Sequence, residues 1–153
     1  MLGELLLYAA LALGAEEPKA APVPAPAAPK TEKADAAQQA DAELLDIERN
    51  IVHYTNQQRV RFGMASLEVD KDLMESARKH CEWMATSQRM VHTSQPVAEN
   101  IAMGHPHSSD VVQGWMNSSG HRANILNRGH SRIGVAAYRA ANGRIFWCQQ
   151  FRR

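Results

Sequence analysis

The chain has 153 residues, which gives room for one domain because globular domains commonly hold roughly 100–200 residues. Its 17 basic and 16 acidic side chains leave a formal net charge of +1, and no basic stripe carries interleaved aromatic residues. Nucleic-acid binding is therefore disfavoured, since neutralising phosphates requires a clustered positive footprint.

The first 15 residues follow the pattern of a signal peptide or N-terminal anchor. The run from Leu5 to Ala15 is apolar and ends in small residues. It is shorter than the roughly 20 apolar residues that cross a bilayer, so we expect no integral membrane span. Glu4 stands where a basic residue is usual, which leaves an uncleaved anchor or a misassigned start codon as alternatives. The pattern predicts a protein that is secreted or held at the cell envelope.

Residues 16–42 are predicted to form a Pro/Ala-rich linker and a frayed region. The prolines between Pro18 and Pro29 are too dense for a helix or a sheet and favour an extended chain. The Ala-, Gln- and Asp-rich stretch that follows suits a frayed helix leading into the domain. We therefore place the domain at residues 43–153.

Two amphipathic helices are predicted at the start of this domain. Apolar side chains recur at helical intervals over residues 44–55, and the first helix should end near Gly63, which suits a left-handed cap. Asp70 is the expected N-cap of the second helix. On that helix Cys81 falls on the apolar face and should point into the core.

A third helix is predicted over residues 109–117, followed by a hairpin. Gly120 is expected to end the helix, so that His121 follows its terminus directly. Farther on, Asn142-Gly143 predicts a two-residue turn with positive φ at both positions. The strand after it is apolar on both faces, which indicates a sheet covered on both sides. Helices followed by strands indicate the α+β class.

Four sequence blocks occur in an order typical of one family. They are residues 54–59, His92, residues 99–101 and residues 115–126. Together they resemble the bacterial branch of the CAP superfamily, which comprises cysteine-rich secretory, antigen 5 and plant pathogenesis-related proteins and is also called SCP-like. The resemblance runs from about Asp46 to Phe151. It implies a three-layer α-β-α sandwich with a C-terminal hairpin and an extracellular location.

The resemblance also implies a cavity lined by two histidines and two acids. These positions fall on His92, Glu99 and His121, while the second acid is replaced by Ser118. Two imidazoles beside a carboxylate are a plausible but incomplete site for a weakly bound divalent metal such as zinc, with His92 and His121 as ligands.

Glu99 has two possible roles in such a cavity. It could act as a general base beside a metal-bound water. We favour the alternative, in which Glu99 accepts hydrogen bonds from a histidine and the backbone and ties a loop to a helix. Asn100 and Asn124 are expected to bridge loops through amide bonds to backbone groups. Arg122 is expected to pair with Glu99 or to cap the preceding helix.

The two cysteines, Cys81 and Cys148, are predicted to form a disulfide. A helix of an α-β-α sandwich packs directly on the strands, so the sulfurs can approach if the second helix covers the Cys148 face. Export would place them in an oxidising compartment. The alternative is two separate buried thiols that act as small hydrophobes.

Three functions are compatible with these residues. The first is a secreted binding or interaction module for an extracellular ligand such as a lipid, a peptide or an envelope component. The second is a metal-assisted, peptidase-like hydrolase that uses His92, Glu99 and His121, and the third is a compact scaffold. The loss of an acid at Ser118 favours binding. The three tryptophans are interpreted as packing residues rather than a carbohydrate platform, and exposure of Trp83 would challenge that interpretation.

Overall fold

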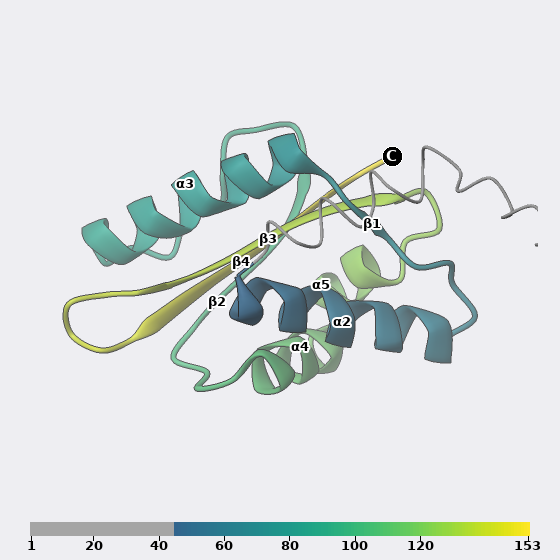
Figure 1. Cartoon of the computed structure of the whole chain (residues 1–153), viewed down its shortest axis with the longest axis horizontal. Coiled ribbons are helices and arrows are strands. Elements are labelled where there is room, and N and C mark those ends of the chain that lie inside the picture. Colours follow the sequence, from purple (N-terminus) through teal and green to yellow (C-terminus); the bar gives the residue numbers. More distant parts are fainter. Residues whose placement is uncertain (1–44) are drawn as a thin grey trace, which may run out of the picture.

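A four-stranded mixed sheet separates two layers of helices in the computed structural model, which describes residues 45–153 (Figure 1). The elements are α2 (Asp46–Arg61), β1 (Glu68–Val69), α3 (Lys71–Ser87), β2 (Ala98–Met103), α4 (Ser108–Asn117), α5 (Ser119–Ile125), β3 (Arg132–Arg139) and β4 (Ile145–Arg152). The strand order is β1-β3-β4-β2, with β1 parallel to β3 and the other pairs antiparallel. Helix α3 covers one face, and α2, α4 and α5 lie on the other. The predicted α+β class and three-layer sandwich are confirmed.

Local sequence signals correctly place the end of α2 and the start of α3. Helix α2 gives way to Gly63, which adopts a left-handed φ of +71°. The side chain of Asp70 accepts a hydrogen bond of 3.0 Å from the backbone N–H of Leu73 and so caps α3. Cys81 is fully buried on the apolar face of α3, as predicted.

The helical region around Gly120 differs from its prediction. Helix α4 ends at Asn117, the next residue Ser118 has an extended backbone, and α5 begins at Ser119. The carbonyl of Ser118 accepts a hydrogen bond of 2.8 Å from Arg122 N, which closes the first turn of the new helix. Gly120 and His121 therefore lie inside α5, and the prediction that Gly120 ends a helix is wrong.

The turn between β3 and β4 is also longer than predicted. Gly143 N donates to Ala140 O at 2.9 Å, and Ala140 N donates to Arg144 O at 2.8 Å, which leaves a three-residue loop over 141–143. Gly143 has a φ of +83°, whereas Asn142 is not in the positive-φ region. The loop thus places its left-handed residue last, as three-residue hairpins do, and the two-residue turn is wrong.

The two faces of β4 enter two separate cores, as its alternation predicts. Ile145, Trp147 and Phe151 pack with α2, α4 and α5, while Phe146 and Cys148 pack under α3. We call the second group, with Cys81 and Met84 of the helix, the α3 core. Close packing of α3 on the sheet depends on Gly134 of β3, because a Cβ atom there would lie 2.2 Å from the backbone carbonyl carbon of Leu73.

The cysteines lie in the α3 core as free thiols, so the predicted disulfide is wrong. The thiol of Cys81 donates to the carbonyl of Phe146 at 3.1 Å, and that of Cys148 donates to Glu99 Oε1 at 3.4 Å. Each sulfur therefore has its own acceptor, although α3 does cover the Cys148 face as expected. Burial raises the pKa of Cys81 to about 12 and raises the pKa of Cys148 well above its ordinary value, so both remain protonated.

The N-terminal expectations, a signal peptide or anchor at residues 1–15 and a linker at 16–42, lie outside the described residues. Among residues 45–153, none of the helices combines the length and apolar character needed to cross a membrane.

Candidate functional site

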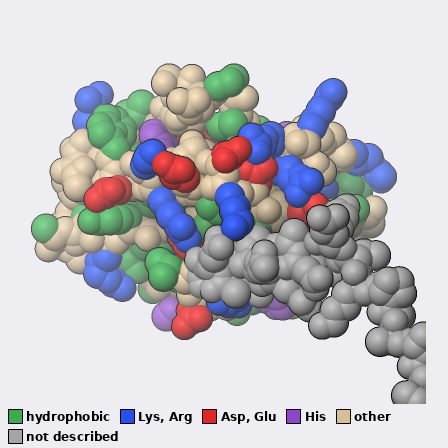
Figure 2. Space-filling view, turned by 45° about the horizontal axis from the view of Figure 1, so that its top comes forward, with side chains coloured by type: hydrophobic (Ala, Val, Ile, Leu, Met, Phe, Trp, Pro, Cys, Tyr) green, Lys and Arg blue, Asp and Glu red, His purple; other side chains and the backbone are tan. Residues whose placement is uncertain are grey.

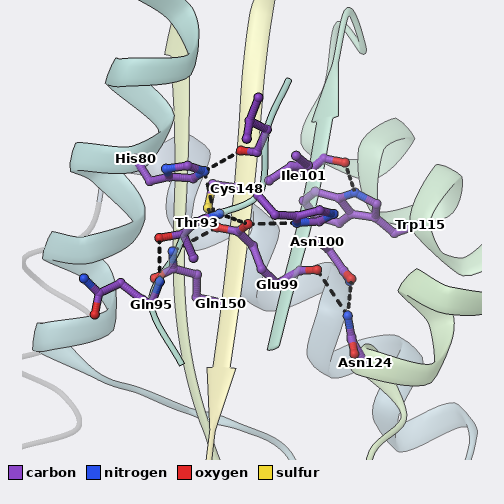
Figure 3. A network of polar contacts seen from close by, with 12 residues as sticks. His80, Thr93, Gln95, Glu99, Asn100, Ile101, Trp115, Asn124, Cys148 and Gln150 are labelled. Carbon is purple, nitrogen blue, oxygen red and sulfur yellow. Dashed lines mark hydrogen bonds and ion pairs between the residues drawn. The ribbon is translucent and has the colours of Figure 1, made fainter. Parts of the chain in front are cut away.

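Glu99 lies at the centre of a polar network on the α3 side of β2 (Figure 3). Its Oε1 accepts hydrogen bonds from Gln150 Nε2 at 3.0 Å and from the thiol of Cys148. Its Oε2 accepts from the backbone N–H of Thr93 and lies 2.9 Å from His92 Nδ1. A carboxylate offers about four lone-pair positions, so these four donors satisfy it.

The same contacts keep Glu99 ionised inside the protein. Burial by itself would raise the pKa of this carboxyl. Hydrogen bonds from Gln150, Thr93 and His92, together with the charge of His80, outweigh burial and lower the pKa below its ordinary range. Glu99 is therefore a fixed anion whose oxygens are already engaged, which suits a structural acceptor better than a general base.

His92 is the exposed partner of Glu99, with 61% of its side chain accessible. An ionised carboxylate only accepts hydrogen bonds, so Nδ1 of His92 carries the hydrogen that it donates to Glu99. The second nitrogen, Nε2, is left available for a hydrogen bond with a ligand.

His121 approaches the same end of β2 from α5. Its backbone carbonyl accepts a hydrogen bond of 3.1 Å from Asn100 Nδ2, the residue next to Glu99. Burial lowers the pKa of the half-buried His121 ring, and charge repulsion from His92 lowers it further. Ser118 is half-buried at the junction of α4 and α5, where its backbone N–H donates to Trp115 O and its carbonyl accepts from Arg122 N. Of the predicted cleft residues, His92 and Glu99 are thus in direct contact.

A chain of side-chain amides, of which Asn100 and Gln149 are fully buried, lies on the opposite face of the sheet. Asn124 Nδ2 donates to Asn100 Oδ1 at 2.9 Å, and Asn100 Nδ2 donates to Gln149 Oε1 at 3.0 Å. Gln149 Nε2 then donates to Thr55 Oγ1 of α2 at 2.6 Å. Asn100 and Asn124 also bond backbone carbonyls, as predicted, at His121 and Glu99 respectively. The chain links α5, β2, β4 and α2.

Two side chains close the outer edge of β2, which lies at the end of the strand order. Asn124 Nδ2 donates to the carbonyl of Glu99 at 3.2 Å, and the indole N–H of Trp115 donates to the carbonyl of Ile101 at 3.3 Å (Figure 3). These carbonyls would otherwise be open to pairing with another strand.

Arg122 does not take either of its predicted roles. Its guanidinium lies over the ring of Phe62, 4.7 Å from the ring centroid, in a cation–π contact. Glu99 already has its donors from other residues, and the expectation that Arg122 pairs with Glu99 or caps the helix before it is wrong.

Two residues of the site were missed from the sequence. Gln150 lies directly opposite Glu99 in the β2–β4 register, and it is a buried polar residue on a strand face otherwise filled by Phe146 and Cys148. That break in the apolar pattern was a usable signal. His80 of α3 lies 3.7 Å from Glu99 Oε1 and donates through Nε2 to the carbonyl of Val91 at 2.8 Å. Nothing local in the sequence connects His80 with Glu99.

A groove of about 460 Å³ opens beside His80, along the outer face of α3. Its lining residues are Asp72, Glu75, Ser76, Lys79, His80, Trp83, Thr93 and Gln95. Within residues 45–153, no group of three or more His, Cys, Asp or Glu side chains is placed to hold a metal ion. Among these described residues, the predicted metal ligands His92 and His121 are not part of such a three-residue group.

Comparison with known proteins shows where this architecture recurs. The CAP family, described as the cysteine-rich secretory protein family, matches residues 52–151. The chain is 32% identical over 142 residues to the uncharacterized protein YkwD of Bacillus subtilis, with 81% of this chain and 54% of YkwD covered. The chain thus spans about half the length of that relative.

Two solved structures share the fold. An extracellular protein from Bacillus anthracis that contains an SCP domain is 26% identical, with a TM-score of 0.63 and coverage of 83% of this chain and 45% of that one. An outer surface protein of Borrelia burgdorferi has a TM-score of 0.62 at 19% identity, over 71% of this chain and 96% of the other. With the family match extending over most of the described residues, the chain belongs to the CAP, or cysteine-rich secretory protein, family.

Proposed function

We propose that this protein is a secreted or envelope-associated binding module whose cleft includes His92, Glu99, Ser118 and His121. The observation that carries the proposal is the saturation of Glu99, whose two oxygens already accept from Gln150, Cys148, Thr93 and His92. A carboxylate held in this way orders its surroundings and has no free position for activating a water. The exposed ring of His92 is the part of the cleft offered to a ligand.

The extracellular location is supported by relatives and by the N-terminal sequence. The similar Bacillus anthracis protein is described as extracellular, and the Borrelia burgdorferi protein is an outer surface protein. Residues 1–15 have the composition of an export signal. The proposed ligand is accordingly a lipid, a peptide or another component of the envelope.

Co-sedimentation of the full chain with peptidoglycan sacculi and with phospholipid vesicles tests the binding function. We expect retention on one of these fractions and loss of retention in His92→Ala. The control is His53→Ala, which removes an exposed histidine from α2. Equal retention of both variants would contradict a role for the cleft. Casein or ester hydrolysis that Glu99→Gln abolishes would replace the binding module with a hydrolase.

A further inference from the structure

Trp83 is held open to solvent beside the Glu99 network. It is 42% exposed, whereas Trp115 and Trp147 are 2% and 0% exposed. The indole stacks on the ring of His80, with centroids 5.8 Å apart and an interplanar angle of 14°. Arg89 lies 5.9 Å from the indole centroid. The ring is therefore a large flat apolar surface whose position is fixed by its neighbours, and it fits a ligand-binding role better than the packing role expected from the sequence.

This indole lines the groove on α3. The helix supplies residues 72, 75, 76, 79, 80 and 83, whose spacing of three or four places them on one helical face. Thr93 and Gln95 form the facing wall. The volume of about 460 Å³ lies within the roughly 300–1,000 Å³ of small-ligand sites.

The facing wall is fixed by the Glu99 network. The backbone N–H of Thr93 donates to Glu99 Oε2 at 2.9 Å, and His80 Nε2 donates to the carbonyl of Val91 at 2.8 Å. Gln95 N donates in turn to Thr93 Oγ1 at 3.3 Å. The groove is thus formed before any ligand arrives, which reduces the entropy lost on binding.

The charged residues of the groove have ion-pair partners. Lys79 Nζ lies 2.5 Å from Glu75 Oε1, and Asp72 Oδ2 accepts from Arg152 at 3.3 Å. Figure 2 shows acidic and basic side chains interspersed on the face over α3. The lining holds two acids, Asp72 and Glu75, and one lysine, Lys79, so it has no excess of positive charge that would select an anionic ligand. Hydroxyl and amide groups of Ser76, Thr93 and Gln95 are the polar groups that accompany the indole.

We propose that this groove binds a neutral saccharide, with a sugar ring stacked on Trp83 and its hydroxyls bonded by the hydroxyl and amide groups of the groove. The proposal rests on the proposed envelope-binding function and gives it a ligand class. The proposed saccharide site lies on the outer face of α3, next to the His92 cleft. Glu99 is a positioning residue for this site, because it holds Thr93 in place.

Titration of the full chain with chitotetraose and with maltotetraose tests the proposal. Because Trp83 is the exposed tryptophan, a bound sugar should protect the fluorescence of its indole from quenching by acrylamide. Amide NMR shifts should cluster at Ser76, Thr93 and Gln95. Trp83→Ala should weaken the binding that the NMR shifts report by about tenfold or more, and Trp83→Phe should weaken it less. Tyr138→Ala, which removes another exposed aromatic, should leave affinity unchanged.

Three results would overturn the saccharide site. They are the absence of shifts with both tetrasaccharides, unchanged affinity in Trp83→Ala, and tighter binding of a sulfated tetrasaccharide of equal length. The two proposals fail separately. Envelope retention that depends on His92 but not on Trp83 would leave the binding function and remove the saccharide site. Saccharide binding without retention on the envelope fractions would leave the saccharide site and remove the envelope-binding function.

Discussion

Replacing Glu99 by glutamine tests how much the carboxylate contributes to the fold. The amide of Glu99→Gln keeps the shape of the side chain but turns a donor toward Gln150 and Cys148 or toward Thr93 and His92. A buried donor facing donors should destabilise the protein by about 1–3 kcal/mol. Urea unfolding measures this loss. Glu75→Gln, which breaks an exposed pair with Lys79, should leave the stability nearly unchanged.

Acidification should destabilise the protein through several groups whose pKa is lowered by folding, and two of them, His121 and Glu99, belong to the site. The pKa of His121 is lowered in the folded state, so the unfolded chain binds its proton first, and stability falls as pH drops below about 6.5. The pKa of Glu99 is also lowered, so its contribution is present above about 4.5 and is lost as pH falls through the folded value. Unfolding free energies measured between about pH 7 and pH 3 should show both losses.

Two variants test which group causes the loss of stability in each pH range. His121→Gln should reduce the stability loss in the upper pH range and leave the part due to His130, whose pKa is also lowered by burial. The difference in stability between the native protein and Glu99→Gln should narrow below about pH 4.5. A constant difference down to about pH 3 would show that Glu99 is not stabilised as an anion.

The sequence predicted that Glu99 would accept hydrogen bonds from a histidine and from the backbone, as His92 and the N–H of Thr93 provide, and it missed the other contacts of this network. The contact between His92 and Glu99 followed from the family resemblance, because both lie in its blocks. Gln150 could have been found from the alternation of β4, as a polar residue on an apolar face. His80 could not, since its distance from Glu99 depends on how α3 lies across the sheet.

At the scale of elements, α3 and β3 approach each other through Gly134. A methyl group at this position would lie 2.2–2.5 Å from three backbone or Cβ atoms of Leu73. Gly134→Ala should therefore force the helix away from the sheet and destabilise the protein by about 3 kcal/mol or more, measured by thermal or urea unfolding.

Gly120 is the matched control for this substitution. It lies in α5 with an ordinary helical backbone and nothing within 4 Å of an added Cβ atom. Gly120→Ala should be neutral or stabilising by up to about 1 kcal/mol, because alanine favours helix. Equal losses of stability in Gly134→Ala and Gly120→Ala would show that the close contact with Leu73 is not the reason why position 134 requires glycine.

The elements that the sequence predicted correctly have local signals at their ends. The Asp70 cap and the left-handed Gly63 act within one turn of the chain and need no tertiary information. The errors arose where a local signal has more than one outcome. Gly120 was interpreted as a helix end but lies inside α5, and Asn142-Gly143 belongs to a three-residue loop whose length depends on the strand register.

At the scale of the whole molecule, the two layers are tied through the sheet by polar groups on both faces. Glu99 connects β2 with His80 of α3, and its neighbour Asn100 connects β2 through Gln149 with Thr55 of α2. Successive residues of a strand point to opposite faces, so two adjacent positions serve both layers. A substitution that breaks these hydrogen bonds of β2 should therefore weaken the packing of the helices on both faces of the sheet.

The two thiols offer a direct measure of this coupling. Cys81 and Cys148 are both fully buried between α3 and the sheet, and burial keeps each protonated by raising its pKa. A thiol reagent should therefore modify neither cysteine in the folded protein at neutral pH, because the thiolate is the reactive form. In denaturant without reductant, both should react and add two alkyl groups to the intact mass.

The labelling rates then distinguish local from global opening. Because both sulfurs lie in the α3 core, either α3 must leave the sheet or the whole domain must unfold to expose them. Since polar ties join the layers, we expect Cys81→Ala and Cys148→Ala to label their remaining thiol with the same steep dependence on urea, matching that of global unfolding. A shallow dependence for either thiol would mean that α3 opens alone. Unreacted cysteines in denaturant would show that the thiols are paired.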